Sequence, residues 1–556
     1  MTAFPWALLA LTLASPAPQA DPGAPPEAVA RWRALRFGMF IHWGPVSLKG
    51  TEIGWSRGAQ VPQEEYDALY RQFNPVLFSA DEWVRTAKEA GMKYLVITTK
   101  HHDGFCLWPT KQTDYHLGNS PFKRDVLREL SEACRRQGIA FGTYYSVCDW
   151  HHPAFPRGSP GGKTRKPNPD LDAYTEYLKK QVAELITGYG PLLTMWFDVP
   201  QEFTPERGRS VVQWVRSLQP DIVINNRCAL PADYDTPEQR VGGFNRARPW
   251  ETCMTICRQW AWKPGDVMKS LPQCLQTLLH VVGGDGNFLF NVGPMPDGRI
   301  EPRQVERLRE MGAWLARYGD GVYGTRGGPF KPGPWGASTC REDKIFLYVM
   351  KWPEEGSLRL PPLPTRILSH RTRSGGKAEV HQTGDGIRVS LPEADRDPVA
   401  TVVELTVEGK AFDLPPVAVP SGGAALSSGK TARASNVFQN QPAYAADKAV
   451  DDDPETRWAT DAGTRQAWLE VDLGAPAELG GVMIDEAFEG RVRKFELQVE
   501  EGGSWRTVLE GTTIGRHYRK SFGPVTARRV RLNILEASEG PTIWEFQLTG
   551  LGGGRK

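Results

Sequence analysis

Polar and aromatic side chains collect where apolar runs end in the first half of the chain. Five runs have the length and composition of buried strands, and they span 37–44, 94–100, 140–147, 192–198 and 222–227. At or just beyond their ends stand His42, His101, His102, Asp198 and Arg227, with Trp and Tyr residues beside them. Imidazole, carboxylate and guanidinium groups can bind hydroxyls, transfer protons and attack electrophiles. The pattern therefore predicts a polar site assembled from several strand ends.

Asp198 is the candidate nucleophile in this set. It closes the apolar run 192–198 and is followed two residues later by Pro200. Strand alternation places Trp196 on the same face as Asp198, and it places Asn225 and Arg227 together on the next strand. A carboxylate in such a position can attack an electrophilic carbon. By position alone, an ordinary loop or helix-capping aspartate explains Asp198 equally well.

A metal-dependent hydrolase is the first alternative. The histidines that would supply ligands are His42, His101, His102, His151 and His152. No H-x-H pair closes the first strand, and adjacent His101 and His102 point to opposite faces if their strand is regular. The residues therefore argue against metal catalysis, and we expect no cofactor for the reaction.

The elements that must position these residues alternate along the chain. Helical periodicity is found at 79–91, 123–137, 170–188, 204–218, 268–282 and 302–318, and a further apolar run at 287–292. Strands alternating with helices over about 300 residues predict an α/β fold, a (β/α) TIM-like barrel over 27–326. Eight clean repeats cannot be counted, so we expect irregular members. Barrels of this type carry their chemistry at the carboxyl ends of the strands.

Beyond the barrel the helical patterns stop. Short apolar segments separated by Pro and Gly predict a small antiparallel β-sandwich over 327–412. A linker is expected at 413–423, and a second all-β unit, a jelly-roll β-sandwich, over 424–552. A length of 556 residues fits two to four domains.

The termini, charge and cysteines limit the possible partners and compartments. Residues 1–20 combine an apolar stretch with small residues, which predicts a secretory signal and export to a periplasmic, extracellular or lysosome-like compartment. Their run of about 11 apolar residues is too short to span a membrane. Net charge is +2 without a basic cluster, which argues against a nucleic-acid partner. The eight Cys, all between Cys106 and Cys340, are expected mainly in apolar packing, with room for one or two disulfides.

Seven segments in order carry a resemblance to a known family. They are FGMFIHWG (37–44), TTKHHDGFCLWPT (98–110), YYSVCDWHHP (144–153), MWFDVP (195–200), DYDTPEQ (233–239), PWETCMTI (249–256) and NFLFNVGPMPDGRI (287–300). Together they resemble the α-L-fucosidases of glycoside hydrolase family 29. The resemblance implies a barrel followed by a small β-sandwich, and a retaining exo-glycosidase that releases terminal fucose.

The resemblance also implies roles for two carboxyl groups. In the family one carboxylate attacks the anomeric carbon and a carboxylic acid protonates the leaving oxygen. The nucleophile position falls on Asp198. The acid/base position falls on Glu238, with Glu251 as the runner-up, although a role as partner to an Arg or Trp is favoured for Glu251. The Asp198 and Glu238 carboxyl groups are expected about 5–5.5 Å apart.

The family's sugar contacts fall on a further set of residues. They are His42, Trp55, His101, His102, Tyr144, Trp196 and Arg227, with Trp260 as an aromatic wall. The TPEQ and WETC variants, with the C-terminal unit, resemble the branch that acts on α-1,3- and α-1,4-linked fucose in Lewis-type glycans. Two alternatives are a glycan-binding protein with a degenerate barrel and a retaining glycosidase for another sugar, such as galactose.

The C-terminal unit carries a second resemblance. AVDDDPETRWAT (449–460), WLEVDLG (468–474) and IWEFQLTG (543–550) resemble discoidin (coagulation factor 5/8 type C) domains, which include carbohydrate-binding modules. This implies a second glycan site and a structural Ca²⁺ held by Lys448 (carbonyl), Asp451, Thr456 and Glu545. Oxygen ligands of this kind suit Ca²⁺. Asp452 stands where these domains usually have Gly, and plain acidic turn residues are the alternative reading.

Overall fold

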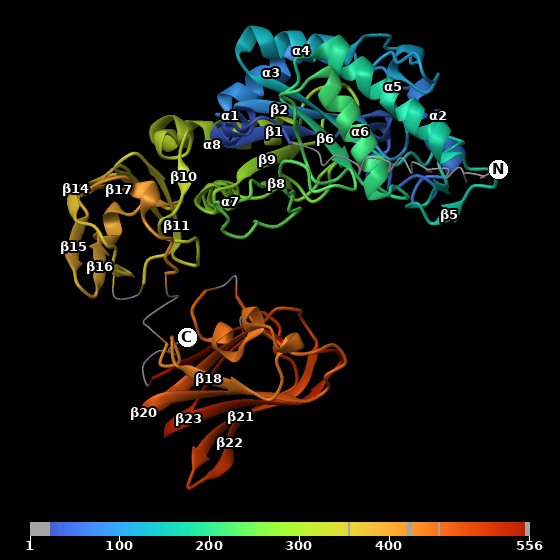
Figure 1. Cartoon of the computed structure of the whole chain (residues 1–556). Helices are drawn as coiled ribbons and strands as arrows, with labels where there is room; N and C mark the ends of the chain where they lie inside the picture. The colour runs from blue at the N-terminus through green and yellow to red at the C-terminus, as the bar shows by residue number, and fades with distance from the viewer. Residues whose placement is uncertain (1–22, 354–355, 420–424, 454–455, 517, 551–556) are drawn as a thin grey trace, which may run out of the picture.

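Three units follow one another along the chain in the computed structural model (Figure 1). The structure describes residues 23–353, 356–419, 425–453, 456–516 and 518–550. The predicted signal at 1–20 and residues 420–423 of the predicted linker lie outside the described residues. The predicted α/β architecture, a barrel-like parallel sheet followed by two antiparallel units, is confirmed.

A parallel seven-stranded sheet forms the first unit, in the order β7-β6-β3-β2-β1-β9-β8. Its strands are β1 (Phe37–Ile41), β2 (Tyr94–Lys100), β3 (Ala140–Ser146), β6 (Thr194–Asp198), β7 (Val223–Ile224), β8 (Glu251–Thr255) and β9 (Asn287–Val292). Nearly all of these strand residues are buried. Helices pack outside and side chains fill the interior, which explains why the strands read as continuous apolar runs.

The segment 233–239 takes the place of the missing eighth strand. Single parallel bridges join Asn225 to Tyr234 on one side, and Asp235 to Trp250 and Glu238 to Cys253 on the other. The predicted strand at 222–227 is only two residues long, because the Asn225 side chain takes over its pairing. That side chain accepts from Phe197 N at 2.9 Å and donates to Phe197 O at 2.8 Å. The segment therefore closes the gap between β7 and β8 without a regular ladder.

Amphipathic helices surround this sheet. They are α1 (Pro26–Leu35), α3 (Ala80–Glu89), α4 (Val126–Gln137), α5 (Leu171–Tyr189), α6 (Pro205–Leu218), α7 (Leu271–Gly283) and α8 (Pro302–Tyr318). Side chains of Ser79, Asp125, Asp170, Thr204 and Ser270 cap the first turns of α3 to α7, which fixes where these helices begin. A short α2 (Gln63–Ala68) and a β4–β5 hairpin (Arg157–Gly158, Thr164–Arg165) belong to loops.

The second unit contains two small antiparallel sheets. One has the order β10-β11-β12-β17-β14 and the other β13-β16-β15. Their bounds are β10 (Arg326–Gly327), β11 (Gly336–Arg341), β12 (Lys344–Val349), β13 (Ser357–Leu360), β14 (Ile367–Thr372), β15 (Glu379–Thr383), β16 (Gly386–Ser390) and β17 (Thr401–Val407). Both sheets contribute to a core of their own.

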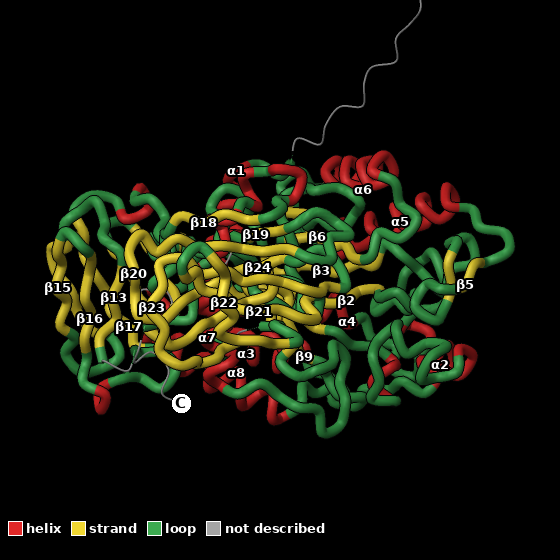
Figure 2. The backbone as a smooth tube through the Cα atoms, turned by 90° about the horizontal axis from the view of Figure 1, so that it is seen from below, coloured by secondary structure: helices red, strands yellow, loops and turns green. Residues whose placement is uncertain are grey.

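The third unit is an antiparallel sandwich, whose strands are yellow in Figure 2. It has a hydrophobic core of its own. Its strands are β18 (Thr431–Ala434), β19 (Trp458–Ala459), β20 (Ala467–Glu486), β21 (Val492–Glu501), β22 (Ser504–Gly511), β23 (Tyr518–Ala537) and β24 (Thr542–Thr549). They run in the order β19-β24-β20-β23-β21-β22, with β18 on β20.

The state of the cysteines and the length of the helices can be compared with the sequence predictions. All eight Cys are buried free thiols, so the packing role holds and no disulfide forms between them. Among the described residues, no helix is long and apolar enough to cross a membrane.

Candidate active site

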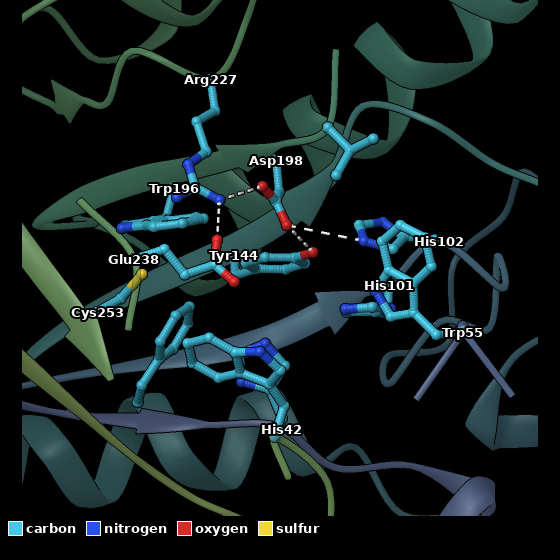
Figure 3. A pocket seen from close by; sticks show the side chains of 13 residues that line it. His42, Trp55, His101, His102, Tyr144, Trp196, Asp198, Arg227, Glu238 and Cys253 are labelled. Carbon is cyan, nitrogen blue, oxygen red and sulfur yellow. Dashed lines mark hydrogen bonds and ion pairs between the residues drawn. The ribbon is translucent and has the colours of Figure 1, made fainter. Parts of the chain in front are cut away.

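A pocket with a cavity volume of about 80 Å³ opens at the carboxyl ends of the barrel strands (Figure 3). It is lined by Phe40, His42, Trp55, His101, His102, Tyr144, Trp196, Asp198, Val199, Arg227, Glu238, Cys253 and Trp260. All eight predicted sugar-contact residues and both favoured carboxylates are in this set. Glu251 is not.

Arg227 joins the two carboxylates. Its Nη1 donates to Asp198 Oδ1 at 2.9 Å and to Glu238 Oε2 at 2.8 Å. Those two oxygens therefore lie no more than 5.7 Å apart, the sum of the two bonds. Retaining glycosidases hold their two carboxyl groups about 5–5.5 Å apart, whereas inverting enzymes need about 6.5–9.5 Å. The geometry favours a retaining pair.

Asp198 is ionised at neutral pH. Burial, the largest single effect, would raise its pKa, but the Arg227 guanidinium, His102 and the hydrogen bonds to the carboxylate together bring the pKa below its ordinary value. Tyr144 adds a hydrogen bond from its hydroxyl to Asp198 Oδ2 at 2.8 Å. The side chain is 12% exposed, so it faces the pocket while remaining largely shielded from water. An ionised, oriented and accessible carboxylate is the form that a nucleophile requires.

Three neutral imidazoles form one side of the pocket. Burial lowers the pKa of His42 to about 3 and that of His102 to about 4, and it places that of His101 well below its usual range. His42 Nδ1 lies 2.7 Å from Asn291 Oδ1, and His102 Nδ1 lies 2.8 Å from Ser146 Oγ. A neutral imidazole has one donor and one acceptor nitrogen, which suits sugar hydroxyls.

Aromatic rings form the other walls. Trp196 stacks on Tyr144 with ring centroids 5.6 Å apart, and the Arg227 guanidinium lies 4.9 Å above the Trp196 ring. Trp260 and Phe40 pack around His42. Trp55 stands at the rim, 44% exposed, on the opposite side of the pocket from Glu238 (Figure 3). The pocket thus combines apolar faces with convergent polar groups, as ligand sites do.

Glu251 lies beneath the pocket rather than in it. It is fully buried, and it accepts hydrogen bonds from Trp196 Nε1 at 3.0 Å and from the Tyr94 hydroxyl at 2.6 Å. Burial raises the pKa of Glu251 to about 7. The structure therefore places it where the sequence reading favoured it, as a partner of a Trp that fixes that ring from below.

The histidine geometry corrects one expectation from the sequence. Strand β2 ends at Lys100, so alternation no longer applies, and His101 and His102 both line the pocket with ring centroids 3.9 Å apart. His151 and His152 stack instead on Tyr115 and Tyr177, outside the lining set. No group of three or more His, Cys, Asp or Glu side chains in the described part of the chain is arranged to hold a metal ion.

Three lining residues were not predicted, and two of them had a signal. Phe40 precedes His42 by two residues on β1, so alternation places both on one face. Cys253 follows Glu251 by two residues on β8, so alternation places these two side chains on one face as well. Val199 had none: its φ of +46° follows from the turn after Asp198, which periodicity does not reveal.

Comparisons with known proteins agree with this geometry. The model of the family described as "Alpha-L-fucosidase" matches residues 18–320, over half of the chain, and that of the "F5/8 type C domain" matches residues 431–546. The chain belongs to the α-L-fucosidases of glycoside hydrolase family 29. The resemblance seen in the seven sequence segments is thus confirmed.

Solved structures place this fucosidase among its relatives. It is 33% identical to α-L-fucosidase isoenzyme 1 from Paenibacillus thiaminolyticus, with a TM-score of 0.63, covering 69% of this chain and 99% of that one. It is 28% identical to a family 29 fucosidase from Bacteroides thetaiotaomicron trapped as a covalent intermediate, with a TM-score of 0.63 and coverage of 70% and 98%. The Vibrio sp. EJY3 fucosidase, 24% identical, shares the fold over 94% of both chains with a TM-score of 0.71.

The fucosidase is a retaining glycoside hydrolase followed by an F5/8 type C domain, and its substrate is fucosylated. Both carboxylates of the pair are present in its pocket, so the degenerate-barrel alternative has no support. The alternative of another sugar, such as galactose, gives way to the family assignment.

The hydrogen bond from Tyr144 to Asp198 predicts a pH effect. Tyr144→Phe should raise the pKa of Asp198, so the acid limb of the kcat/KM profile should move to higher pH by about one unit, the scale of one hydrogen bond to a charged group. Tyr145→Phe is the matched control, because the Tyr145 hydroxyl bonds Gln181 outside the pocket. Equal shifts in both variants, or none in Tyr144→Phe, would contradict the effect.

Proposed function

We propose that Asp198 is the nucleophile and Glu238 the acid/base of this retaining α-L-fucosidase. The observation that carries the proposal is the single guanidinium nitrogen that bonds both carboxylates. Asp198 is the buried, ionised member at a strand end, whereas Glu238 is 40% exposed at the pocket mouth. A nucleophile must lie beneath the anomeric carbon, and an acid must reach the leaving oxygen on the open side.

Hydrolysis takes place in two steps in this geometry. Asp198 attacks the anomeric carbon while Glu238 gives its proton to the glycosidic oxygen, so the C–O bond breaks and the aglycone leaves as an alcohol. Water then enters beside Glu238, which takes one of its protons as the oxygen attacks the same carbon. The ester to Asp198 breaks, and fucose is released with its original anomeric configuration. Arg227 orients both carboxylates in the free enzyme.

The remaining pocket residues bind fucose in this proposal. The neutral His42, His101 and His102 exchange hydrogen bonds with the ring hydroxyls. The apolar surface of Phe40 and Trp260 shelters the C5 methyl group. A protonated imidazole would form an ion pair with the Asp198 carboxylate. The low pKa values of these histidines keep the rings neutral, so the carboxylate stays available to attack the anomeric carbon.

We further infer that the scissile linkage is α-1,3 or α-1,4 to GlcNAc in Lewis-type glycans. The TPEQ and WETC sequence variants and the C-terminal domain support this branch. The exposed position of Glu238 is compatible with a branched leaving group.

Azide distinguishes the two carboxylates by stereochemistry. In Asp198→Gly, azide can replace the missing nucleophile, so residual activity, lowered about 10⁴-fold, should recover and give the β-fucosyl azide. In Glu238→Ala, azide attacks the covalent intermediate, so activity lowered about 10²–10⁴-fold should recover and give the α-fucosyl azide. NMR of the products reads the outcome.

Glu251→Ala is the control for that experiment. The buried Glu251 touches no substrate, so its variant should lose activity or stability without azide recovery. Recovery with an α-azide product in Glu251→Ala, and not in Glu238→Ala, would transfer the acid/base role to Glu251.

The linkage is tested with natural substrates. Wild-type enzyme should release fucose from a Lewis-type trisaccharide at least about tenfold faster than from 2′-fucosyllactose, a difference of 1.4 kcal/mol in activation free energy. Comparable rates on both, or a preference for 2′-fucosyllactose, would contradict the linkage while leaving the enzyme class intact.

We propose that the C-terminal domain binds a structural Ca²⁺ through Lys448, Asp451, Thr456 and Glu545. Thr456 Oγ1 lies 2.7 Å from Asp451 Oδ1 and 3.2 Å from the Lys448 carbonyl. Both Glu545 carboxylate oxygens are buried with no partner among the described residues. Burial, followed by the nearby Asp452 and Asp451, raises the pKa of Glu545 to about 9. A carboxyl group orphaned beside acidic groups fits a site that a cation completes.

Two further observations bear on this cation site. Asp452 adopts φ +55°, the left-handed conformation that Gly would favour, so the tight turn forms with Asp in its place. The predicted set supplies two carboxylates, one hydroxyl and one carbonyl, and no group of three or more His, Cys, Asp or Glu side chains among the described residues is arranged to hold a metal ion. When bound, the ion would brace Asp451 and Thr456 against Glu545 on β24, and the domain would present a second glycan site.

Calcium should therefore stabilise the protein. Added Ca²⁺ should raise the melting temperature of this domain and a chelator should lower it, with about 2.7 kcal/mol of stabilisation at a hundredfold excess over Kd. Glu545→Gln should abolish the dependence, whereas Glu510→Gln, at an exposed site on β22, should keep it. A melting curve of wild type that Ca²⁺ leaves unchanged would contradict the site.

A further inference from the structure

A second pocket lies directly behind the Glu238 side of the catalytic pocket. This rim pocket is an open depression with a cavity volume of about 260 Å³. It is lined by Gln239, Thr255, Cys257, Arg258, Val267, Met268, Lys269 and Gln273. All of these residues stand at the catalytic end of the barrel: at the end of segment 233–239, at or after the end of β8, or in the first turn of α7.

The two pockets share one wall. Glu238 lines the catalytic pocket and the next residue, Gln239, lines the rim pocket. On β8, Cys253 lines the catalytic pocket and Thr255 lines the rim pocket. Gln239 N donates to Cys253 O at 2.9 Å, and Gln239 Nε2 donates to Thr255 Oγ1 at 3.2 Å. A chain of atoms that passes Glu238 and crosses this rim therefore enters the rim pocket.

The loop after β8 also links the pockets. It carries Trp260 into the catalytic pocket and Arg258 into the rim pocket. Asp266 Oδ2 holds this loop by accepting from Arg258 N at 2.9 Å and from Gln259 N at 3.0 Å. Glu52 fixes its other side by accepting from Trp260 N at 3.0 Å. The wall is braced by defined contacts and needs no rearrangement to receive a ligand.

The chemistry of the rim pocket suits a sugar chain. Gln239, Gln273 and Arg258 present amide and guanidinium groups at exposed positions. The Arg258 guanidinium makes no ion pair with any described residue, so it can donate to hydroxyls or to an acidic substituent. Val267 is 58% exposed and offers an apolar surface for a sugar face, beside Met268.

We propose that the rim pocket is the aglycone site, which binds the oligosaccharide beyond the scissile fucose. The inference rests on the proposed role of Glu238, because the leaving oxygen must lie beside the group that protonates it. Sugars attached to that oxygen then extend past Glu238 and over Gln239. Trp55 lies on the opposite side of the catalytic pocket from Glu238 (Figure 3).

The test compares two substrates that share the fucose and differ in the aglycone. Arg258→Ala and Val267→Asp change exposed side chains, so folding should survive. Each should lower kcat/KM on a fucosylated trisaccharide by about tenfold, while kcat/KM on p-nitrophenyl α-L-fucoside stays within about twofold. The defucosylated disaccharide should inhibit the wild-type enzyme, and it should inhibit both variants more weakly.

Arg165→Ala is the matched control. Arg165 is an exposed Arg of the β4–β5 hairpin, whose Gly161 packs against Trp55 on the other side of the pocket. It should change neither substrate. A trisaccharide-selective loss in Arg165→Ala but not in Arg258→Ala, equal losses on both substrates, or no loss in either rim variant would overturn the aglycone site.

A failure of the proposed catalytic roles can be distinguished from a failure of the aglycone site. The aryl fucoside reports on Asp198 and Glu238 alone, so the azide products decide those roles whatever the rim variants do. An enzyme that cleaves the aryl fucoside but no oligosaccharide would overturn the rim pocket, since its aglycone would never be a sugar.

Discussion

The bridging guanidinium of Arg227 is the interaction on which the site depends. Two carboxylates this close repel each other, and a buried charge without a partner is costly. The positive charge of Arg227 offsets the repulsion between the carboxylates and gives the buried Asp198 a partner. The two carboxylates in turn raise the pKa of Arg227 despite its burial. Its position is fixed in turn by the Trp196 ring below it and by Thr236, which accepts from Nε at 2.7 Å. Glu251 holds that ring from the barrel interior.

The irregular segment 233–239 is what brings an acid to this guanidinium. A regular strand followed by a helix would carry the chain away from the pocket mouth. Here single bridges to β7 and β8 hold the segment, Asp233 anchors its start through Arg216, and Arg227 itself bonds Thr236. The barrel therefore closes through the same residues that complete the active site. The rim pocket exists for the same reason, since the segment's far side is left open toward α7.

Much of this architecture could be predicted from the sequence, for identifiable reasons. Strands such as β2 and β9 are short segments built around apolar residues, and α8 begins at Pro302 with clear periodicity, so their bounds matched. The segment 233–239 has neither signal, because its pairing runs through single bridges and side chains. Glu238 therefore looks like a loop residue, and only the family resemblance singled it out. The resemblance placed His101 and His102 together among the sugar contacts, whereas strand alternation could not, because β2 ends at Lys100.

Covalent labelling tests the central claim most directly. A 2-fluoro-fucosyl fluoride should transfer its fucosyl group to the nucleophile, with loss of fluoride, faster than the resulting ester hydrolyses, and peptide mapping by mass spectrometry then locates the sugar. The account predicts one label, on the peptide that contains Asp198, with labelling slowed when the pocket holds a competing fucose analogue. A label on the Glu238 or Glu251 peptide, or an active enzyme that carries no label, would contradict it.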